Sequence, residues 1–217
     1  MAHSPTKKFA ISRLFQPVTH KTPLLSLANA YTLSDLTDFN MQLTQQLGQD
    51  NLAYTLEPKL DGVAVAIQYQ DGHLRTAATR GTGLQGDDIT AHVMAIRGLP
   101  HVLPHKMTLE CRGELYMTRA NFEALNQTLA TPFANPRNTV AGTIRHRDPK
   151  ACADRVLSVC IYQVLSDAVT LPDTHYERLQ WLDALGIPVP ALRDCHASMQ
   201  DLIVALDMFK QQQYYPA

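Results

Sequence analysis

The stretch EPKLDG, residues 57–62, places a lysine two residues before an Asp-Gly pair and directly after a proline. An ordinary lysine amine has a pKa of about 10.4 and is a poor nucleophile at neutral pH. It becomes reactive where burial or a nearby cation lowers that pKa, or where a carboxylate helps to remove the proton. Strand alternation would place Lys59 and Asp61 on one face, and Gly62 would let a ligand approach closely. Taken alone, the stretch is better explained as a turn at the end of a strand.

The chain around this stretch mixes strand and helix patterns. Asp71-Gly72 separates VAVAIQYQ from HLRTAATR, which is the strongest short-range signal for a β-hairpin. Further strands are expected at 52–57, 107–117 and 155–165, the last of them buried because it is almost continuously apolar. Helices are expected from Ser34 to about Leu47 and from near Asp87, Thr118, Thr174 and Ser198. Because strands and helices do not alternate strictly, the pattern predicts one α+β domain built on antiparallel sheet.

The composition is that of a globular protein with one substantial core. The chain has 217 residues, of which 45% are hydrophobic and 18% charged, and its formal net charge is −1. No apolar run is long enough to cross a bilayer. The first residues lack the apolar segment of a signal peptide, so we expect a cytoplasmic protein that makes no membrane contact.

The cysteines and histidines do not suggest a metal site. None of the four cysteines belongs to a Cys-x-x-Cys pair, and the nine histidines are scattered along the chain. Three of the cysteines lie among apolar neighbours and are expected to be buried free thiols.

Three further motifs offer groups that a nucleotide could use, although each has a plainer explanation. In ATRGTGLQGDDIT (78–90), Arg80 precedes glycines whose N–H groups could contact a phosphate or simply form a loop. In ECRGELYM, Glu114 could hold a ribose hydroxyl or pair with Arg112. In FANPRNTVAGTIRHRDP (133–149), the arginines could bind phosphates or form a solvated basic face.

Together, the order and spacing of these motifs resemble the adenylation domain of NAD-dependent DNA ligases. The matching segments are EPKLDG, ATRGTGLQGDD, RGE and FANPRNTVAGTIR, in that order. HKTPLLSLANAY (20–31) and LPDTHYERLQWLDALGIPV (171–189) also resemble family segments, so the similarity covers nearly the whole chain. The resemblance implies a nucleotidyltransferase fold, which is ATP-grasp-like, with antiparallel β-sheets and flanking helices.

The resemblance also implies a reaction. In that family the motif lysine attacks the α-phosphorus of NAD, expels nicotinamide mononucleotide and becomes lysyl-AMP, with Mg²⁺ assisting. The AMP then passes to the 5′-phosphate at a nick in duplex DNA, and the 3′-hydroxyl displaces it to seal the nick. Such a transfer needs an in-line nucleophile and positive charge around the phosphoryl oxygens.

By the same resemblance, Lys59 is the nucleophile, and Asp61 orients it, deprotonates it or supports the metal. The residues expected around the adenosine part of NAD are Ser26, Leu27, Glu57, Leu60, Arg80 and Glu114. Arg137 and Arg145 are expected near phosphates of the nucleotide or of DNA, and no residue is assigned as a direct metal ligand.

These assignments predict where the pocket and the DNA-binding surface lie. The pocket is expected between the hairpin at Asp71-Gly72 and the strand bearing Glu114, with Lys59 at its floor. Arg137, Arg145 and Arg147 are expected to form a phosphate-facing surface with weak, non-specific affinity for DNA.

The chain also departs from the family. We expect residues 1–19 to form an N-terminal arm and residues 20–217 an adenylation domain that stops before the family's last two lysine-bearing strands. The other family domains would then be supplied in cis or in trans: the nicotinamide-binding helical domain, the OB-fold, the zinc finger, the helix-hairpin-helix repeats and the BRCT domain. Thr82 stands where the family usually has aspartate, so one acceptor beside the loop is lost.

The residues leave three functions open. The chain could be the adenylation domain of a DNA-joining enzyme, or a degenerate module that binds an adenosine nucleotide or a DNA end without chemistry. It could also be another lysine nucleotidyltransferase, such as an ATP-dependent ligase or a capping enzyme. The segment 133–149 and the RGE motif favour the NAD-dependent branch over that third function.

Overall fold

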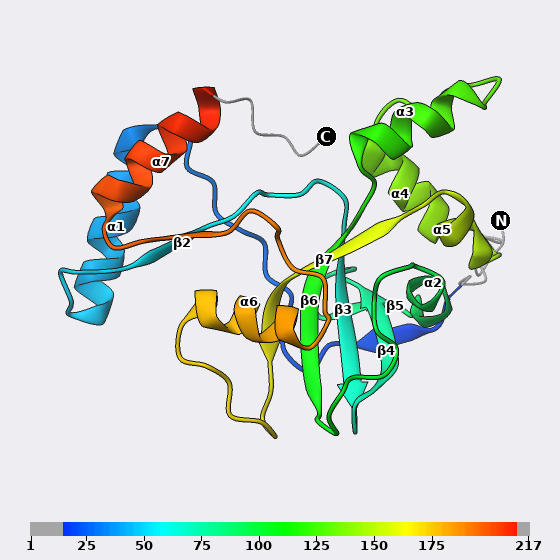
Figure 1. Ribbon diagram of the computed structural model, residues 1–217, viewed down its shortest axis with the longest axis horizontal. Helices are drawn as coiled ribbons and strands as arrows, with labels where there is room; N and C mark the ends of the chain where they lie inside the picture. The colour runs from blue at the N-terminus through cyan, green and yellow to red at the C-terminus, as the bar shows by residue number, and fades with distance from the viewer. Residues whose placement is uncertain (1–14, 212–217) are drawn as a thin grey trace, which may run out of the picture.

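The computed structural model describes residues 15–211 and is organised around a four-stranded antiparallel sheet in the order β4-β3-β6-β7 (Figure 1). Its strands are β3 (Val63–Gln70), β4 (His73–Thr79), β6 (Leu109–Tyr116) and β7 (Ser158–Leu165). The sheet is antiparallel throughout and carries helices around it, which confirms the predicted α+β class.

The hairpin predicted at Asp71-Gly72 is present. Both turn residues have positive φ, 51° for Asp71 and 81° for Gly72, as the tight turn between two twisted strands requires. Gln70 pairs with His73 across this turn. A Cβ on Gly72 would also lie 2.8 Å from the carbonyl oxygen of His105, so glycine is needed here for two reasons.

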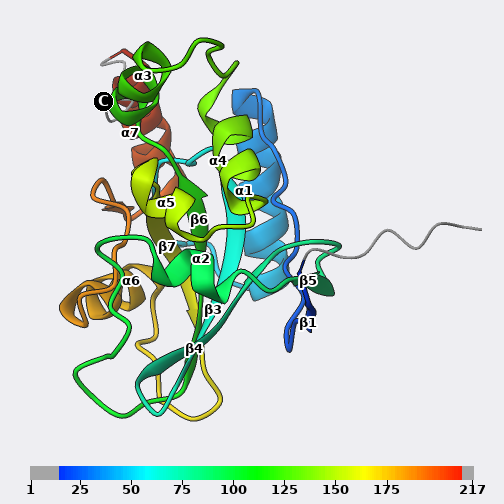
Figure 2. The ribbon, with the colours of Figure 1, turned by 90° about the vertical axis from the view of Figure 1, so that its right-hand side faces the viewer.

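Helices cover the sheet and close one hydrophobic core. They are α2 (Thr90–Met94), α3 (Arg119–Gln127), α4 (Pro136–Ile144), α5 (Lys150–Asp154) and α6 (His175–Ala184). α6 packs against β7 and buries Leu179 and Leu182 completely, while α4 packs against β3 and β6 (Figures 1 and 2). Cys111, Cys152 and Cys160 are buried free thiols, as expected for three of the four cysteines.

Two short strand pairs lie outside the main sheet. β1 (Pro17–Thr19) pairs with β5 (Gln85–Asp87), and β2 (Tyr54–Leu56) pairs with β8 (Asp194–His196). The second pair adjoins α1 (Leu33–Leu47) and α7 (Met199–Gln211), which lie side by side in Figure 1. β1 falls in the stretch expected to be an irregular arm. Residues 1–14 of that stretch and the C-terminal residues 212–217 lie outside the described part of the chain.

Helix starts follow the capping residues. The caps predicted at Thr118, Thr174 and Ser198 are confirmed, because each hydroxyl accepts the backbone N–H three residues on. The cap predicted at Ser34 is wrong: Thr32 caps α1, since it has the partner Asp35 that completes a capping box. α2 starts at Thr90 and not near Asp87, because residues 85–87 pair with β1.

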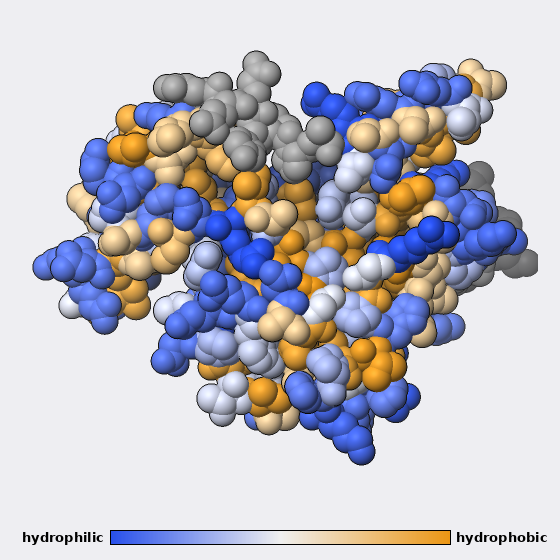
Figure 3. Space-filling view, viewed as in Figure 1, coloured by the Kyte–Doolittle hydropathy of each residue, from blue (hydrophilic) through white to orange (hydrophobic). Residues whose placement is uncertain are grey.

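Several large apolar side chains of α1 stay exposed. Leu33, Phe39, Met41 and Leu47 are each at least 46% exposed, and Figure 3 shows hydrophobic patches among hydrophilic ones over α1 and α7. Within residues 15–211, no helix is both long enough and apolar enough to cross a membrane.

Candidate active site

Two adjoining cavities open at the end of the sheet where β3 begins and β4 ends. Their volumes are about 480 and 410 Å³, and both are lined by Leu27, Lys59, Glu114 and Tyr162. The larger, which we call the cationic cavity, is also lined by Ser26, Arg80, Arg137 and Arg145. The smaller, which we call the apolar cavity, is also lined by Glu57, Pro58, Leu60, Cys160, Gln163, His175 and Pro190.

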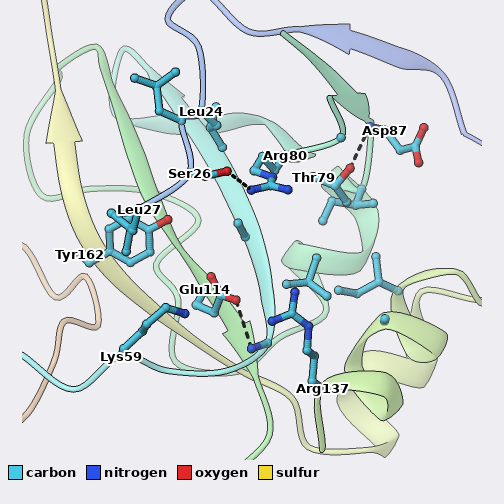
Figure 4. Close-up of a pocket in the computed structure, with 18 of the residues that line it drawn as sticks. Leu24, Ser26, Leu27, Lys59, Thr79, Arg80, Asp87, Glu114, Arg137 and Tyr162 are labelled. Atoms are coloured by element: carbon cyan, nitrogen blue, oxygen red, sulfur yellow. Dashed lines mark hydrogen bonds between the residues drawn. The ribbon is translucent and has the colours of Figure 1, made fainter. Parts of the chain in front are cut away.

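The expected walls are confirmed, because Val63 and Ala64 of β3, Thr79 of β4 and Glu114 of β6 line the cationic cavity, but the cavity does not lie between β3 and β6. β3 and β6 pair directly along their length, from Val63 opposite Leu115 to Tyr69 opposite Leu109, and leave no space between them. The turn closes the opposite end of the hairpin. Lys59 and Glu114 do line the same two cavities, and Figure 4 shows the Lys59 amine directed toward Glu114.

The stretch 57–62 is an irregular link between β2 and β3 and not part of a strand. The alternation that was expected to place Lys59 beside Asp61 therefore does not apply. Gly62 is also explained differently: a Cβ there would lie 1.9 Å from the carbonyl oxygen of Leu115, so the close approach is made by the protein's own backbone. The glycine lets the link pass tightly over β6 into β3.

Nearly all of the sequence-predicted site residues line one of the cavities, with Asp61 as the exception. Those that do are Ser26, Leu27, Glu57, Lys59, Leu60, Arg80, Glu114, Arg137 and Arg145. Asp61 forms an ion pair with Arg137, whose Nη1 lies 2.6 Å from the Asp61 Oδ1. Both side chains are more than half exposed, so this pair contributes little to stability. Its effect is to hold the Arg137 side chain.

Glu114 lies in β6 opposite Ala64 and accepts a hydrogen bond from the Gly62 N–H at 3.1 Å (Figure 4). Burial raises the pKa of Glu114 above its ordinary value, and the Gly62 N–H, Lys59 and Arg137 offset part of that rise. The alternative in which Glu114 pairs with Arg112 is wrong, because the Arg112 Nε donates to Glu110 at 2.9 Å. The Glu114 carboxylate thus faces the cavities.

Arg112 instead fastens residues 20–27, which we call the strap, across the sheet. Its Nη1 and Nη2 donate to the carbonyl oxygens of Pro23 and Thr22 at 2.9 and 2.6 Å. The buried His20 adds a hydrogen bond from its Nε2 to the Thr79 carbonyl oxygen at 3.0 Å. Sequence reasoning missed this role, since nothing local relates Arg112 to a segment about 90 residues earlier.

The strap brings Ser26 and Leu27 to the cavities. The Arg80 Nη1 donates to the Ser26 Oγ at 3.0 Å, which orients the guanidinium at the end of β4 (Figure 4). The glycine loop after Arg80 supports the strap, because the Gly83 carbonyl oxygen accepts from the Leu24 N–H at 2.9 Å. The N–H groups of Thr82 and Gly83 donate to the carbonyl oxygens of Gln85 and Arg80 within the loop. These two N–H groups are therefore not available to bind an anion.

One face of α4 forms the wall opposite the strap. Asn135 caps the helix by accepting from the Asn138 N–H at 2.8 Å, and Pro136 fits the first turn. Arg137, Ala141 and Arg145 line the cationic cavity at four-residue spacing, which places them along one helix face. The small Ala141 separates the two arginines along this face. Arg147 lies beyond the helix and does not line the cavity, so that part of the expected arginine surface is separate from the site.

Tyr162 enters both cavities because of a β-bulge. Arg112 pairs with Gln163 but Gly113 pairs with Ile161, so Tyr162 is an extra residue in β7. Gly113 permits this geometry, since a Cβ there would lie 2.3 Å from the Cys160 carbonyl oxygen. The apolar run of β7 was expected to be wholly buried, but the bulge turns Tyr162 and Gln163 outward. No local sequence pattern predicts such a bulge.

The apolar cavity holds the carboxylates of Glu57 and Glu114 among mostly apolar walls. The Glu57 Oε1 lies 2.5 Å from the His175 Nε2. Burial, with a smaller effect from Glu57, raises the pKa of the Cys160 thiol to about 12, so this thiol stays protonated. His175 was not identified from the sequence as a site residue.

The carboxylates near Lys59 suit a magnesium ion that is held mainly by a substrate. Within residues 15–211, no group of three or more His, Cys, Asp or Glu side chains could hold a metal. Mg²⁺ commonly binds through one or two carboxylates together with substrate phosphates. Glu114, which lines both cavities, and Asp61, whose charge interacts with that of Glu114, are the carboxylates that could provide that contribution.

Comparison with known proteins agrees with these features. The sequence model described as "NAD-dependent DNA ligase adenylation domain" matches residues 12–215. The DNA ligase of Bacillus subtilis (strain 168) is 40% identical over 210 residues, which cover 94% of this chain and 31% of the relative. The DNA ligase of Stutzerimonas stutzeri (strain A1501) is 42% identical over 204 residues, which cover 86% of this chain and 26% of the relative.

The chain therefore spans a third or less of the length of these relatives. The family match covers nearly the whole chain and favours the NAD-dependent branch over ATP-dependent ligases and capping enzymes. By this match and by its fold, the chain belongs to the family of NAD-dependent DNA ligase adenylation domains.

Proposed function

We propose that the chain forms the lysyl-AMP intermediate of an NAD-dependent DNA ligase, with Lys59 as the nucleophile. The observation that carries this proposal is the place of Lys59 at the junction of two unlike cavities. A nucleotide needs an apolar site for its base and a positively charged site for its phosphates. Because Lys59 lines both cavities, it lies where the α-phosphorus of a bound nucleotide would be.

In the proposed reaction, the neutral Lys59 amine attacks the α-phosphorus of NAD. A P–N bond forms, and nicotinamide mononucleotide leaves with the electron pair of the broken P–O bond. Arg80, Arg137 and Arg145 line the cavity where negative charge builds up on the phosphoryl oxygens. The amine must lose a proton before it attacks, and Glu114 and Asp61 are the nearby carboxylates that could take it.

The adenosine part would lie toward the apolar cavity. Tyr162 and Leu27 form walls shared by both cavities, and Leu60 and Pro190 continue the apolar surface. Glu57 is the carboxylate available to the edge of the base, and Glu114 is available to the ribose. Mg²⁺, when bound, would neutralise phosphate charge, with Glu114 and Asp61 as its protein contacts.

The later steps need partners. We propose that the AMP is passed to the 5′-phosphate of nicked duplex DNA, and that other ligase domains act with this one in cis or in trans. Residues 20–217 would then be the adenylating unit and residues 1–19 a lead-in. The free thiols of the chain favour a reducing, cytoplasmic setting for this reaction.

Intact-protein mass spectrometry after incubation with NAD and Mg²⁺ tests the proposal. We expect a fraction of the chain to gain one AMP, and Lys59→Ala to gain none. Lys106→Ala is the matched control, because this exposed lysine lies near the Asp71-Gly72 end of the hairpin, and it should behave like the unaltered chain. Binding of AMP by calorimetry without any covalent adduct would instead support the second function, a non-catalytic nucleotide-binding module.

A further inference from the structure

The Glu57 side chain is held by one residue from a distant part of the chain. The His175 Nε2 lies 2.5 Å from the Glu57 Oε1, although the two residues are 118 positions apart. Because an ionised carboxylate can only accept hydrogen bonds, the Nε2 must carry the proton and donate. Within residues 15–211, His175 is the hydrogen-bond partner of this carboxylate, and the Glu57 side chain is only 17% exposed.

His175 is itself held firmly at the start of α6. The preceding residue, Thr174, forms a capping box with Glu177, in which the Thr174 hydroxyl and the Glu177 carboxylate each accept a backbone N–H at 3.2 Å. Further along the helix, Leu179 and Leu182 are completely buried against the core. The backbone that carries His175 is therefore fixed, while its ring stays 43% exposed and fills no core position.

This arrangement leaves one carboxylate oxygen for a ligand. His175 occupies the Oε1 of Glu57, and the apolar walls around the carboxylate include Leu60 and Pro190. An ionised carboxylate in such a wall attracts an N–H donor and repels a carbonyl oxygen. A purine with an exocyclic amine, such as adenine, therefore fits this edge better than hypoxanthine, which has a carbonyl at the same position.

We propose that His175 is a positioning residue that fixes Glu57 and thereby sets the preference of the cavity for an amino-bearing purine. The inference rests on the proposed function, since it assumes that the base of an adenosine nucleotide enters the apolar cavity. Without the His175 ring, the Glu57 side chain can take other rotamers, and the acceptor is no longer held at one place. Affinity for AMP then falls, and the penalty against a carbonyl-bearing base falls as well.

The test is a comparison of AMP and inosine monophosphate binding by isothermal titration calorimetry, using the 217-residue chain. We expect the unaltered chain to prefer AMP. His175→Ala should lower that preference about tenfold, because a hydrogen bond to a charged group is lost from the recognition of the base. His175→Gln should keep most of the preference, because its amide can donate to Glu57. His105→Ala is the matched control, an exposed histidine near the hairpin turn, and should change nothing.

Double variants of Glu57 and His175 distinguish a positioning role of His175 from a general structural effect. Glu57→Gln should weaken the preference by itself, and His175→Ala added to it should have little further effect if His175 acts through Glu57. A preference that is unchanged in His175→Ala, or affinities for both nucleotides that fall equally, would overturn the inference while the proposed function stands. If the unaltered chain binds neither AMP nor NAD, both are overturned.

Discussion

Replacing Arg112 with methionine should loosen the strap that carries Ser26 to the cavities. Methionine keeps much of the length and apolar volume of the side chain but has no donor. The change removes the hydrogen bonds to the carbonyl oxygens of Thr22 and Pro23. It also leaves Glu110 without its ion-pair partner inside the sheet.

The loss of stability in Arg112→Met is large because the ion pair between Arg112 and Glu110 is buried. The Arg112 and Glu110 side chains are only 8% and 11% exposed. Removing one member of a buried ion pair costs about 3–5 kcal/mol, since the remaining charge stays buried without compensation. For a domain of this size, each kcal/mol lowers Tm by about 2–4 °C. We therefore expect Arg112→Met to lower Tm by roughly 6–20 °C.

Thermal unfolding and AMP titration measure the two effects separately. The double change Glu110→Met and Arg112→Met removes both charges and should recover part of the lost stability. Well below its Tm, Arg112→Met should bind AMP more weakly, and Ser26→Ala added to it should have little further effect. A stability loss below about 1 kcal/mol, or a double variant no more stable than the single one, would refute the assignment of Arg112 as the strap anchor.

Three other changes test separate parts of the account. Gly62→Ala should lower the free energy of unfolding in urea by at least about 2 kcal/mol, because its Cβ would lie 1.9 Å from the Leu115 carbonyl oxygen. An unchanged midpoint of the urea unfolding curve would contradict this. Burial raises the pKa of Glu114, so stability is lost as the pH rises from the ordinary value of 4.5 through the raised one. Glu114→Gln should therefore raise Tm at neutral pH and leave it unchanged well below pH 4.5, whereas an equal shift at both would argue against a buried carboxylate. Duplex DNA should bind with a Kd on the order of 10⁻⁴–10⁻⁶ M that weakens with salt. The double variant Arg137→Ala and Arg145→Ala should reduce the slope of the logarithm of affinity against the logarithm of salt concentration by about two. An unchanged slope would place the DNA elsewhere.

The features that sequence predicted well are local. The Asp71-Gly72 turn and the Thr174–Glu177 capping box each depend on residues a few positions apart, so the chain chemistry alone decides them. The resemblance to ligase motifs added what local patterns cannot give, because it named residues from five separate segments that the fold gathers around two cavities. Their roles in catalysis stay predictions.

The features that sequence missed depend on distant pairing. Tyr162 reaches the cavities through a β-bulge, which is set by the register between β6 and β7 and not by the apolar pattern of β7. His175 meets Glu57 through the packing of α6 against β7. Strand alternation does not place Asp61 beside Lys59, because residues 57–62 form an irregular link, and the Asp61 carboxylate pairs with Arg137.

The most direct test of the central claim is to locate the AMP on the chain. After incubation with NAD and Mg²⁺, the protein is digested and its peptides are sequenced by tandem mass spectrometry. The account predicts that AMP is attached to Lys59 alone, and that Lys59→Arg, which keeps the charge, abolishes the adduct. AMP attached to any other residue, or an adduct that persists in Lys59→Arg, would contradict the claim that the residue between the two cavities is the nucleophile.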